Sequence, residues 1–311
     1  MAHSPSYDVP SQRRPPPTRV KRLLGLTAVA LVAIGLIGDR RDRLRPLHQA
    51  EWLAAGDVMV RTVRAGQGDT TLLMLHGFGE SLVSFRNIID PLARHYRVVA
   101  LDLPGFGLSD KPAGSYSLAT TVVRIQNFIA RWIQGPVVIV GHSMGGEVAA
   151  AVALAQPPHV TAVVLISPAG YALGPWIGDS SVSWPRRGWV GSAIAYVLPM
   201  HDPAWLSEPA DRAAYEPFSD PAYRESSHRV LAEFDFGALR DRYPDVTQPV
   251  LVIWGERDPT IPLSVGEAIA RALPRGQLVI IPGALHRPQE THPEQVVAEI
   301  ERFLGRDPDM P

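Results

Sequence analysis

The chain has 311 residues, of which 46% are hydrophobic and 20% charged, so most of it is expected to form one large α/β domain, or a domain with an insertion. The formal net charge of -1 gives no electrostatic reason to expect a nucleic-acid partner. The absence of cysteine excludes disulfides, thiolate metal sites and a cysteine nucleophile.

The N-terminal part differs in composition from the rest. Residues 1–22 are polar, basic and rich in proline, which predicts a disordered tail. Residues 23–38 contain no charge and would span about 24 Å as a helix, slightly less than a hydrocarbon core of about 30 Å. Because a basic cluster follows directly, an uncleaved membrane anchor is favoured, with the globular part outside the cytoplasm. Secretion after signal cleavage and a helix packed on the protein are the alternatives.

After a charged, partly helical connector over residues 39–56, apolar strands alternate with amphipathic helices. The predicted strands are 58–63, 70–77, 96–105, 137–141, 160–168, 249–255 and 276–283. The predicted helices are 81–95, 117–133 with Ser117 as N-cap, a helix from 143, 263–273 and 293–304. Continuous apolar strands between helices indicate a parallel sheet covered on both faces.

Residues 171–245 interrupt this alternation. The segment has no good buried strand and is rich in proline and aromatic residues, among them Trp176 and Trp184. Such a stretch between two sheet strands predicts an inserted helical cap, which divides the core domain into residues 57–170 and 246–306. A long packed excursion with no role in binding is the alternative.

The sequence GHSMG at residues 141–145 fits the pattern G-x-S-x-G. It follows a buried strand and opens a helix, which is the context in which such a serine is held exposed on a strained turn. The flanking glycines remove side chains that would collide with the neighbouring backbone, and the helix N-terminus points N–H groups at the site. Ser143 is therefore the predicted nucleophile; a small residue at a tight turn is the alternative.

A serine nucleophile needs a base, and the base needs an orienting acid. Among the histidines after Ser143, only His286 follows a predicted core strand, where it can reach the carboxyl edge of the sheet. Asp258 follows another core strand in the same way and is the predicted acid, with Glu256 as the runner-up. The remaining histidines lie before a strand, in the predicted cap or at the start of the last helix: His159, His201, His228 and His292.

A tetrahedral intermediate also needs N–H donors for its oxyanion. The N–H of Met144, directly after the nucleophile, and the N–H of Phe78, in the loop after the strand at 70–77, are the predicted donors. His76 in the same loop is expected to brace it rather than to act as a base.

With these motifs the chain resembles the α/β-hydrolase family. The resemblance covers residues 57–306 and rests, in family order, on HGFGES (76–81), LDLPGFGLSDKP (101–112), GHSMGG (141–146), GERDPTIP (255–262) and GALHRPQETHPEQV (283–296). It implies a mostly parallel eight-stranded sheet flanked by helices, with an inserted helical cap after the sixth strand. It also implies Ser143, Asp258 and His286 as the catalytic triad, and structural roles for Asp102 and Ser109.

The motifs leave the type of hydrolase open. Serine at the nucleophile position argues against the dehalogenase and epoxide hydrolase branches, which carry aspartate there. The aromatic-rich cap favours a small-molecule lipophilic carboxylic ester, cleaved through an acyl-enzyme, with Phe78, Trp176 and Trp184 as substrate-binding residues. A haloperoxidase-like enzyme, a meta-cleavage-type C–C bond hydrolase and a non-catalytic ligand-binding module are the alternatives. The C–C hydrolase would need a basic residue near the carboxylate of its substrate. Possible sources are Arg124, Arg186, Arg187 and Arg224.

No metal or cofactor is expected. The sequence has no His/carboxylate cluster at ligand spacing, and its glycine-rich segments lack the lysine of a phosphate loop. Besides the possible membrane contact through residues 23–38, the sequence indicates no macromolecular partner and no particular oligomeric state.

Overall fold

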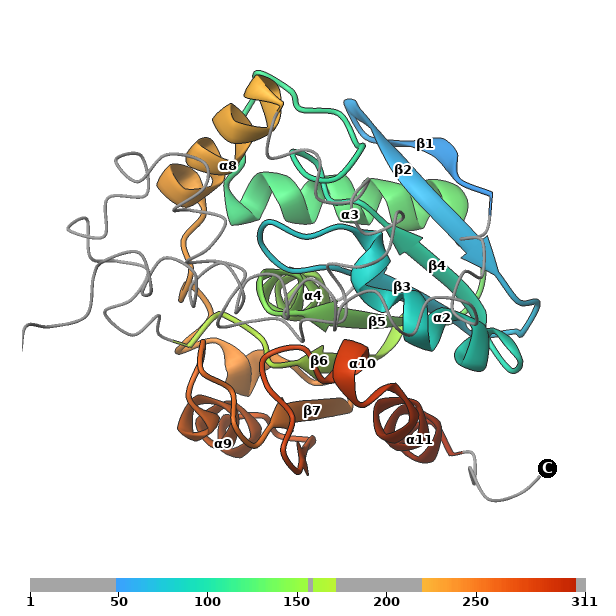
Figure 1. The fold of residues 1–311 in the computed structure, drawn as a ribbon, viewed down its shortest axis with the longest axis vertical. Helices are drawn as coiled ribbons and strands as arrows, with labels where there is room; N and C mark the ends of the chain where they lie inside the picture. The colour runs from blue at the N-terminus through green and yellow to red at the C-terminus, as the bar shows by residue number, and fades with distance from the viewer. Residues whose placement is uncertain (1–48, 156–158, 172–219, 306–311) are drawn as a thin grey trace, which may run out of the picture. The chain divides into compact units, whose positions relative to one another are not determined.

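The computed structural model describes residues 49–155, 159–171 and 220–305. Within them an eight-stranded sheet has the order β1-β2-β4-β3-β5-β6-β7-β8 (Figure 1). Its strands are β1 (Glu51–Ala55), β2 (Val58–Ala65), β3 (Thr71–Leu75), β4 (Arg97–Leu101), β5 (Val137–His142), β6 (Val160–Ile166), β7 (Val250–Gly255) and β8 (Gly276–Ile281). The pairs β1–β2 and β2–β4 are antiparallel and the other neighbours are parallel, which confirms the predicted mostly parallel sheet.

β1 lies in the segment that the sequence suggests to be a partly helical connector. It pairs with β2 across a turn at Gly56, whose φ of 69° suits a residue without a side chain. β1 is an edge strand, and its Trp52 is 52% exposed. A strand of this kind lacks the continuous apolar run of the buried strands, so its sequence gives a weak signal.

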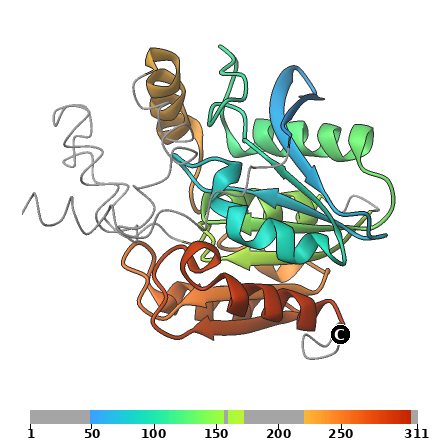
Figure 2. The same ribbon diagram turned by 45° about the vertical axis from the view of Figure 1, so that its right-hand side comes forward.

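The central strands bury both of their faces. Leu72 and Met74 of β3 belong to one apolar cluster, and Leu73 and Leu75 belong to the other, because successive residues of a strand point to opposite faces. The first face is covered by α2 (Arg86–Ala93) and α11 (Pro293–Phe303), and the second by α3 (Leu118–Trp132), α4 (Met144–Leu154) and α9 (Leu263–Ala272) (Figure 2). Two short helices, η1 (Leu82–Phe85) and α10 (Pro288–Thr291), complete the first face.

The predicted N-cap of α3 is confirmed, since the Ser117 hydroxyl accepts a hydrogen bond from the Thr120 N–H at 3.2 Å. Capping of this kind stabilises a helix by about 1 kcal/mol.

Most of the predicted cap, residues 172–219, lies outside the described residues, together with Trp176 and Trp184. The described end contains the helix α8 (Pro221–Glu233) and the short η5 (Tyr243–Asp245). α8 rests on the loop after β4, where the Ser226 hydroxyl donates to the Gly105 carbonyl at 2.6 Å. The division into core and cap therefore remains a prediction.

The predicted membrane anchor and the location built on it have to be corrected. No helix among the described residues is both long and apolar enough to cross a membrane. The longest of them, α3, has 15 residues, which span about 22 Å, and it carries Arg124 and Arg131. Residues 23–38, on which both the anchor and the cleaved signal depend, lie outside the described residues. The prediction of a membrane-anchored location is corrected to this extent: none of the described residues supports it.

A buried acid connects α4 to the segment that returns from α8. Glu147 lies in the first turn of α4, and its Oε1 accepts a hydrogen bond from the Gly237 N–H at 3.0 Å. Burial raises the pKa of Glu147 to about 8, and the charge of Asp235 adds to this, while hydrogen bonds from Gly237 and Ala238 oppose it. At neutral pH this carboxyl group is therefore mostly protonated.

This shift predicts a specific loss of stability as the pH rises from about 4.5 to about 8. The pKa of Glu147 is higher in the folded chain than its ordinary value of 4.5. The contribution of this carboxyl group to the free energy of unfolding is therefore fully present below about pH 4.5 and is lost as the pH rises through about 8. Between pH 5 and 9 the wild type should lose on the order of 2–4 kcal/mol relative to Glu147→Gln. Urea unfolding of both proteins across this range measures the difference, and a constant difference would contradict the prediction.

Candidate active site

The predicted nucleophile occupies a strained turn between β5 and α4. Ser143 has φ 51° and ψ -118°, a left-handed backbone that costs a residue with a side chain about 1–3 kcal/mol. Two backbone hydrogen bonds hold it there: its N–H donates to the Ile166 carbonyl at 3.0 Å, and its carbonyl accepts from the Ala169 N–H at 2.9 Å. β5 thus ends and α4 begins within one residue, with the serine between them.

The glycines beside this turn are required by close packing. A Cβ on Gly141 would collide with the backbone of Gly145, and a Cβ on Gly145 would collide with the carbonyl oxygen of Leu75 at the end of β3. The start of α4 therefore lies directly against the loop that follows β3.

The structure brings together the three residues of the predicted triad. His286 Nε2 lies 3.0 Å from Ser143 Oγ, and His286 Nδ1 lies 2.7 Å from Asp258 Oδ2. Because a carboxylate can only accept, Nδ1 carries the proton and Nε2 is free to accept the serine proton. The geometry matches that of a serine activated by an oriented imidazole.

Asp258 is held in its ionised form although it is buried. Burial by itself opposes ionisation, but the charge and hydrogen bond of His286 outweigh it and lower the pKa of Asp258 below its usual range. The N–H groups of Thr260 and Ile261 add hydrogen bonds to Oδ1 of 2.8 and 3.0 Å. The carboxylate is therefore fixed on both sides, with one oxygen directed at the imidazole.

The runner-up acid and the other histidines have different surroundings. Glu256 Oε2 accepts from the Gly283 N–H at 2.8 Å, and this contact lies at an exposed position. His159 precedes β6, His228 lies on α8, and His292 Nδ1 contacts the Thr291 hydroxyl at 2.8 Å. His201 lies outside the described residues.

The loop of the predicted oxyanion donor lies beside the nucleophile turn. A Cβ on Gly77 would lie 3.0 Å from His142 Nδ1, so this loop and the end of β5 are in contact. Phe78 is half-buried, and its ring packs edge-on against Phe106 at 5.5 Å and Phe236 at 6.5 Å. Met144 is the first residue of α4. Met144 therefore directly follows Ser143, and the loop that contains Phe78 contacts the residue before it. The roles of both residues as donors remain predictions.

His76 has two local hydrogen bonds that fix its form. Its Nε2 accepts from the Leu103 N–H at 2.8 Å, and its Nδ1 donates to the Gly77 carbonyl at 2.7 Å. Burial lowers the pKa of His76, which agrees with a neutral ring. His76 thus connects the loop after β3 to the loop after β4, as expected of a brace.

Asp102 and Ser109 have the structural contacts that the sequence suggested. Asp102 accepts hydrogen bonds from the N–H groups of Leu82 and Leu108 at 2.7 and 2.8 Å. The Ser109 hydroxyl donates to the Asp102 carbonyl at 2.7 Å and accepts from the Arg61 N–H at 2.8 Å.

The structure also contains a buried cluster of ionisable side chains that the sequence did not predict. It consists of Glu80, His142 and Arg287, whose side chains are at most 2% exposed. Each of them lies within a motif that points to another residue. One signal in the sequence could have indicated this cluster: its ionisable residues lie at the end of β5 or in the segments that follow β3 and β8.

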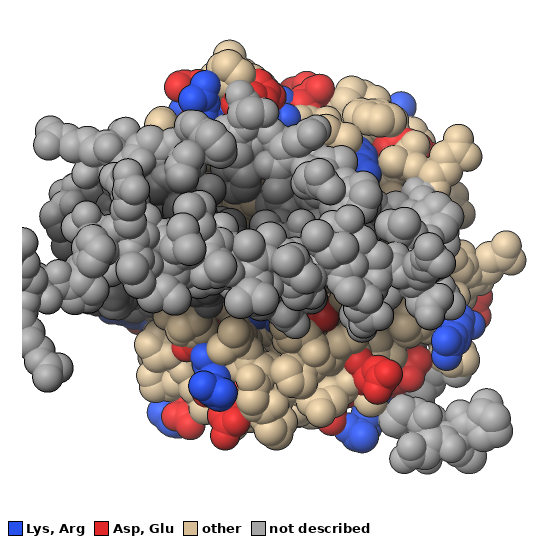
Figure 3. Space-filling view, viewed as in Figure 1, with Lys and Arg blue, Asp and Glu red and all other residues tan. Residues whose placement is uncertain are grey.

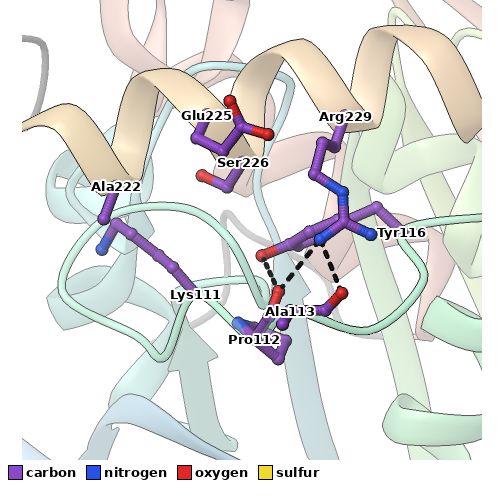
Figure 4. Close-up of a pocket in the computed structure, with 8 residues that line it drawn as sticks. All are labelled: Lys111, Pro112, Ala113, Tyr116, Ala222, Glu225, Ser226 and Arg229. Carbon is purple, nitrogen blue, oxygen red and sulfur yellow. Dashed lines mark hydrogen bonds between the residues drawn. The ribbon is translucent and has the colours of Figure 1, made fainter.

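A pocket of about 300 Å³ lies between α8 and the loop 111–116 (Figure 4). No residue of the predicted triad lines it. Arg229 crosses it and donates to the carbonyls of Pro112 and Ala113 at 3.5 and 2.8 Å (Figure 4). These bonds attach α8 to the loop 111–116 of the core.

The basic residues proposed for a substrate carboxylate are only partly described. Arg124 is buried, and its Nε and Nη2 donate to Asp57 at 2.8 and 2.9 Å. Arg224 lies on α8, and Arg186 and Arg187 lie outside the described residues.

On the face shown in Figure 3, basic and acidic side chains of the described residues are interspersed. No group of three or more histidine and acidic side chains in these residues could hold a metal ion.

Three known proteins illustrate what the chain is similar to. A 2-hydroxy-6-oxo-6-(2'-aminophenyl)hexa-2,4-dienoic acid hydrolase from Metapseudomonas resinovorans is 30% identical over 283 residues, which cover 86% of this chain and 95% of the relative. A pimeloyl-(acyl-carrier protein) methyl ester esterase from Aeromonas salmonicida is 28% identical over 267 residues, covering 79% and 99%. The crystal structure of a bacterial membrane phospholipase A has a TM-score of 0.66 at 25% identity, covering 92% and 98%.

Residues 72–300 match the alpha/beta hydrolase family, and this match spans the sheet from β3 to β8 and all the residues of the predicted triad. The chain belongs to the alpha/beta hydrolase family, which confirms the fold and the broad hydrolase class that its motifs predict.

Proposed function

We propose that the chain is a serine hydrolase that cleaves a lipophilic carboxylic ester through Ser143, His286 and Asp258. The observation that carries the proposal is the continuous chain of contacts from Ser143 Oγ to His286 at 3.0 Å and from His286 to Asp258 at 2.7 Å. A similar esterase and a similar phospholipase A support an ester as the substrate class.

The geometry supports the following sequence of steps. Ser143 Oγ attacks the ester carbonyl while His286 Nε2 takes its proton, and Asp258 stabilises the resulting imidazolium. The oxyanion accepts hydrogen bonds from the N–H groups of Met144 and Phe78. His286 then returns the proton to the leaving alcohol as the ester C–O bond breaks, which leaves the acyl group on Ser143 Oγ. In the second half, His286 activates a water that releases the acid and restores the serine.

The side chains around Phe78 favour an apolar acyl or alcohol group. Phe78, Phe106, Phe236 and Tyr223 form a series of edge-on aromatic contacts beside the nucleophile turn. Such rings contribute large apolar surfaces and no charge. Trp176 and Trp184 remain part of this proposal as further binding residues.

Hydrolysis of a C–C bond is the second candidate. The relative from Metapseudomonas resinovorans acts on a keto acid whose name contains no ester group. A site for such a substrate needs a cation near its carboxylate, and Arg124, the buried candidate among the described arginines, already forms a bidentate pair with Asp57. This pairing argues against Arg124 as the residue that binds a substrate carboxylate.

The first prediction from the proposed function concerns the nucleophile. The full-length protein should react with a fluorophosphonate at Ser143 and hydrolyse p-nitrophenyl esters from C2 to C12, with a preference for longer chains. Ser143→Ala should lower kcat by at least about 10³-fold and abolish the adduct, because alanine lacks the hydroxyl group that attacks. Mass spectrometry of the labelled peptide and initial rates measure both effects.

A folded wild-type protein without adduct and without turnover would refute the serine hydrolase. An adduct accompanied by faster cleavage of a 2-hydroxy-6-oxo-hexadienoate than of any ester would transfer the assignment to the C–C hydrolase.

The second prediction concerns the acid. Asp258→Asn should lower kcat by about 10²–10⁴-fold, because the amide no longer orients and stabilises the charged imidazole. Glu256→Gln, two residues away, should remain within about twofold of the wild type, since Glu256 is bonded to Gly283 instead. Rates with one p-nitrophenyl ester compare the variants. A larger loss in Glu256→Gln than in Asp258→Asn would exchange the two roles.

A further inference from the structure

We infer that Glu80 is a positioning residue of this hydrolase: through His142 and Arg287 its carboxylate fixes the loop of the predicted oxyanion donor, the nucleophile turn and the loop of the predicted base relative to one another. The inference rests on the proposed function, because it concerns the placement of the same reacting groups.

Glu80 forms a contact with each of these three segments. Its Oε2 accepts from the Gly77 N–H at 3.0 Å, next to Phe78. The same oxygen lies 3.0 Å from Nδ1 of His142, the residue before Ser143. Its Oε1 lies 3.0 Å from Nη2 of Arg287, the residue after His286. One side chain thus connects three loops that are far apart in the sequence.

His142 extends this connection to the backbone of the predicted base. Its Nε2 lies 3.0 Å from the carbonyl oxygen of His286, and its Nδ1 faces the carboxylate of Glu80. The ring of His142 thus lies between the carboxylate of Glu80 and the backbone of His286, and it contacts both. The rings of His142 and His286 are 4.9 Å apart. His142 therefore supports the segment that carries the predicted base.

The charges of the cluster stabilise one another. Burial opposes the ionisation of Glu80, but the charges of Arg287 and His142 outweigh it and hold the pKa of this carboxyl well below its usual range. Arg287 also lies 3.5 Å from Glu290. An ionised carboxylate with two cationic partners can stay buried at neutral pH, whereas any of the three alone would be strongly disfavoured.

The three residues that Glu80 contacts are close enough to the reacting groups to affect the rate of hydrolysis. Each one ends within one residue of Phe78, Ser143 or His286. The oxyanion and the proton transfer need these groups in place together, and a displacement of about 1 Å can cost about 10²-fold in rate. By contrast, Glu80 itself does not contact Ser143 or the predicted oxyanion donors through any of these bonds, so it acts through its neighbours.

Glu80→Gln in the full-length protein tests this role. Glutamine keeps the size of the side chain and an acceptor for Gly77 but removes the negative charge. Active sites are counted by titration with a fluorophosphonate, so that unfolded protein does not enter kcat. We expect kcat per titrated site to fall about 10- to 100-fold, with KM within about twofold.

A second readout separates positioning from stability alone. An alkyl trifluoromethyl ketone accepts Ser143 Oγ at its carbonyl carbon, the serine proton passes to His286, and the ketone oxygen becomes an oxyanion. Its inhibition constant should rise in Glu80→Gln by about the same factor as kcat falls, because both depend on the aligned site. A mere loss of stability would leave the inhibition of the remaining folded enzyme unchanged.

Glu301→Gln is the matched control. Glu301 is also a buried glutamate with a histidine partner, His95 at 3.9 Å, but it lies on α11 away from the three loops. This variant should keep kcat per site and the inhibition constant within about twofold. If Glu80→Gln does not fold, Arg287→Lys tests the same connection from the other loop, with an expected loss of about 5- to 10-fold in kcat per site.

The outcomes separate this inference from the function on which it rests. A wild type labelled at Ser143, with a folded Glu80 or Arg287 variant that equals it in kcat per site and in inhibition, overturns the positioning role alone. A wild type that is neither labelled nor active overturns the proposed function, and the positioning role with it.

Discussion

The left-handed backbone of Ser143 is the constraint on which the rest of the site depends. A helix can start directly at the end of β5 only if one residue reverses the chain, and Ser143 does this with φ 51°. Its N–H and carbonyl are bonded to the backbone at the end of β6, which stabilises the unfavourable conformation. Because Gly145 has no side chain, α4 also contacts the end of β3. The loop after β3 is thereby brought beside the serine.

The three buried acids near this turn differ in charge because their surroundings differ. Asp258 faces His286, and Glu80 faces His142 and Arg287, so in both the neighbouring cations outweigh the effect of burial. Glu147 receives only backbone hydrogen bonds and has Asp235 nearby, so burial raises its pKa to about 8. Asp258 and Glu80 are therefore ionised beside cationic neighbours, while Glu147 holds α4 to the chain that returns from α8.

Aromatic contacts connect the site to the segment expected to form the cap. Tyr223 of α8 packs on Phe106 at 6.1 Å, and Phe106 packs on Phe78 in the loop of the predicted oxyanion donor. The contacts are apolar and therefore compatible with a lipophilic substrate.

The sequence by itself determined the elements whose signal is local. Apolar runs gave the buried strands, Ser117 gave the start of α3, and GHSMG placed a serine at a strand-to-helix turn, because each depends on neighbouring residues. Only the tertiary structure decided what depends on distant partners. The edge strand β1 exists through its pairing with β2, and Asp258 rather than Glu256 faces His286 because the loops after β7 and β8 meet. The contacts of Glu80 with His142 and Arg287 likewise join side chains far apart in the sequence, whose approach no local pattern reveals.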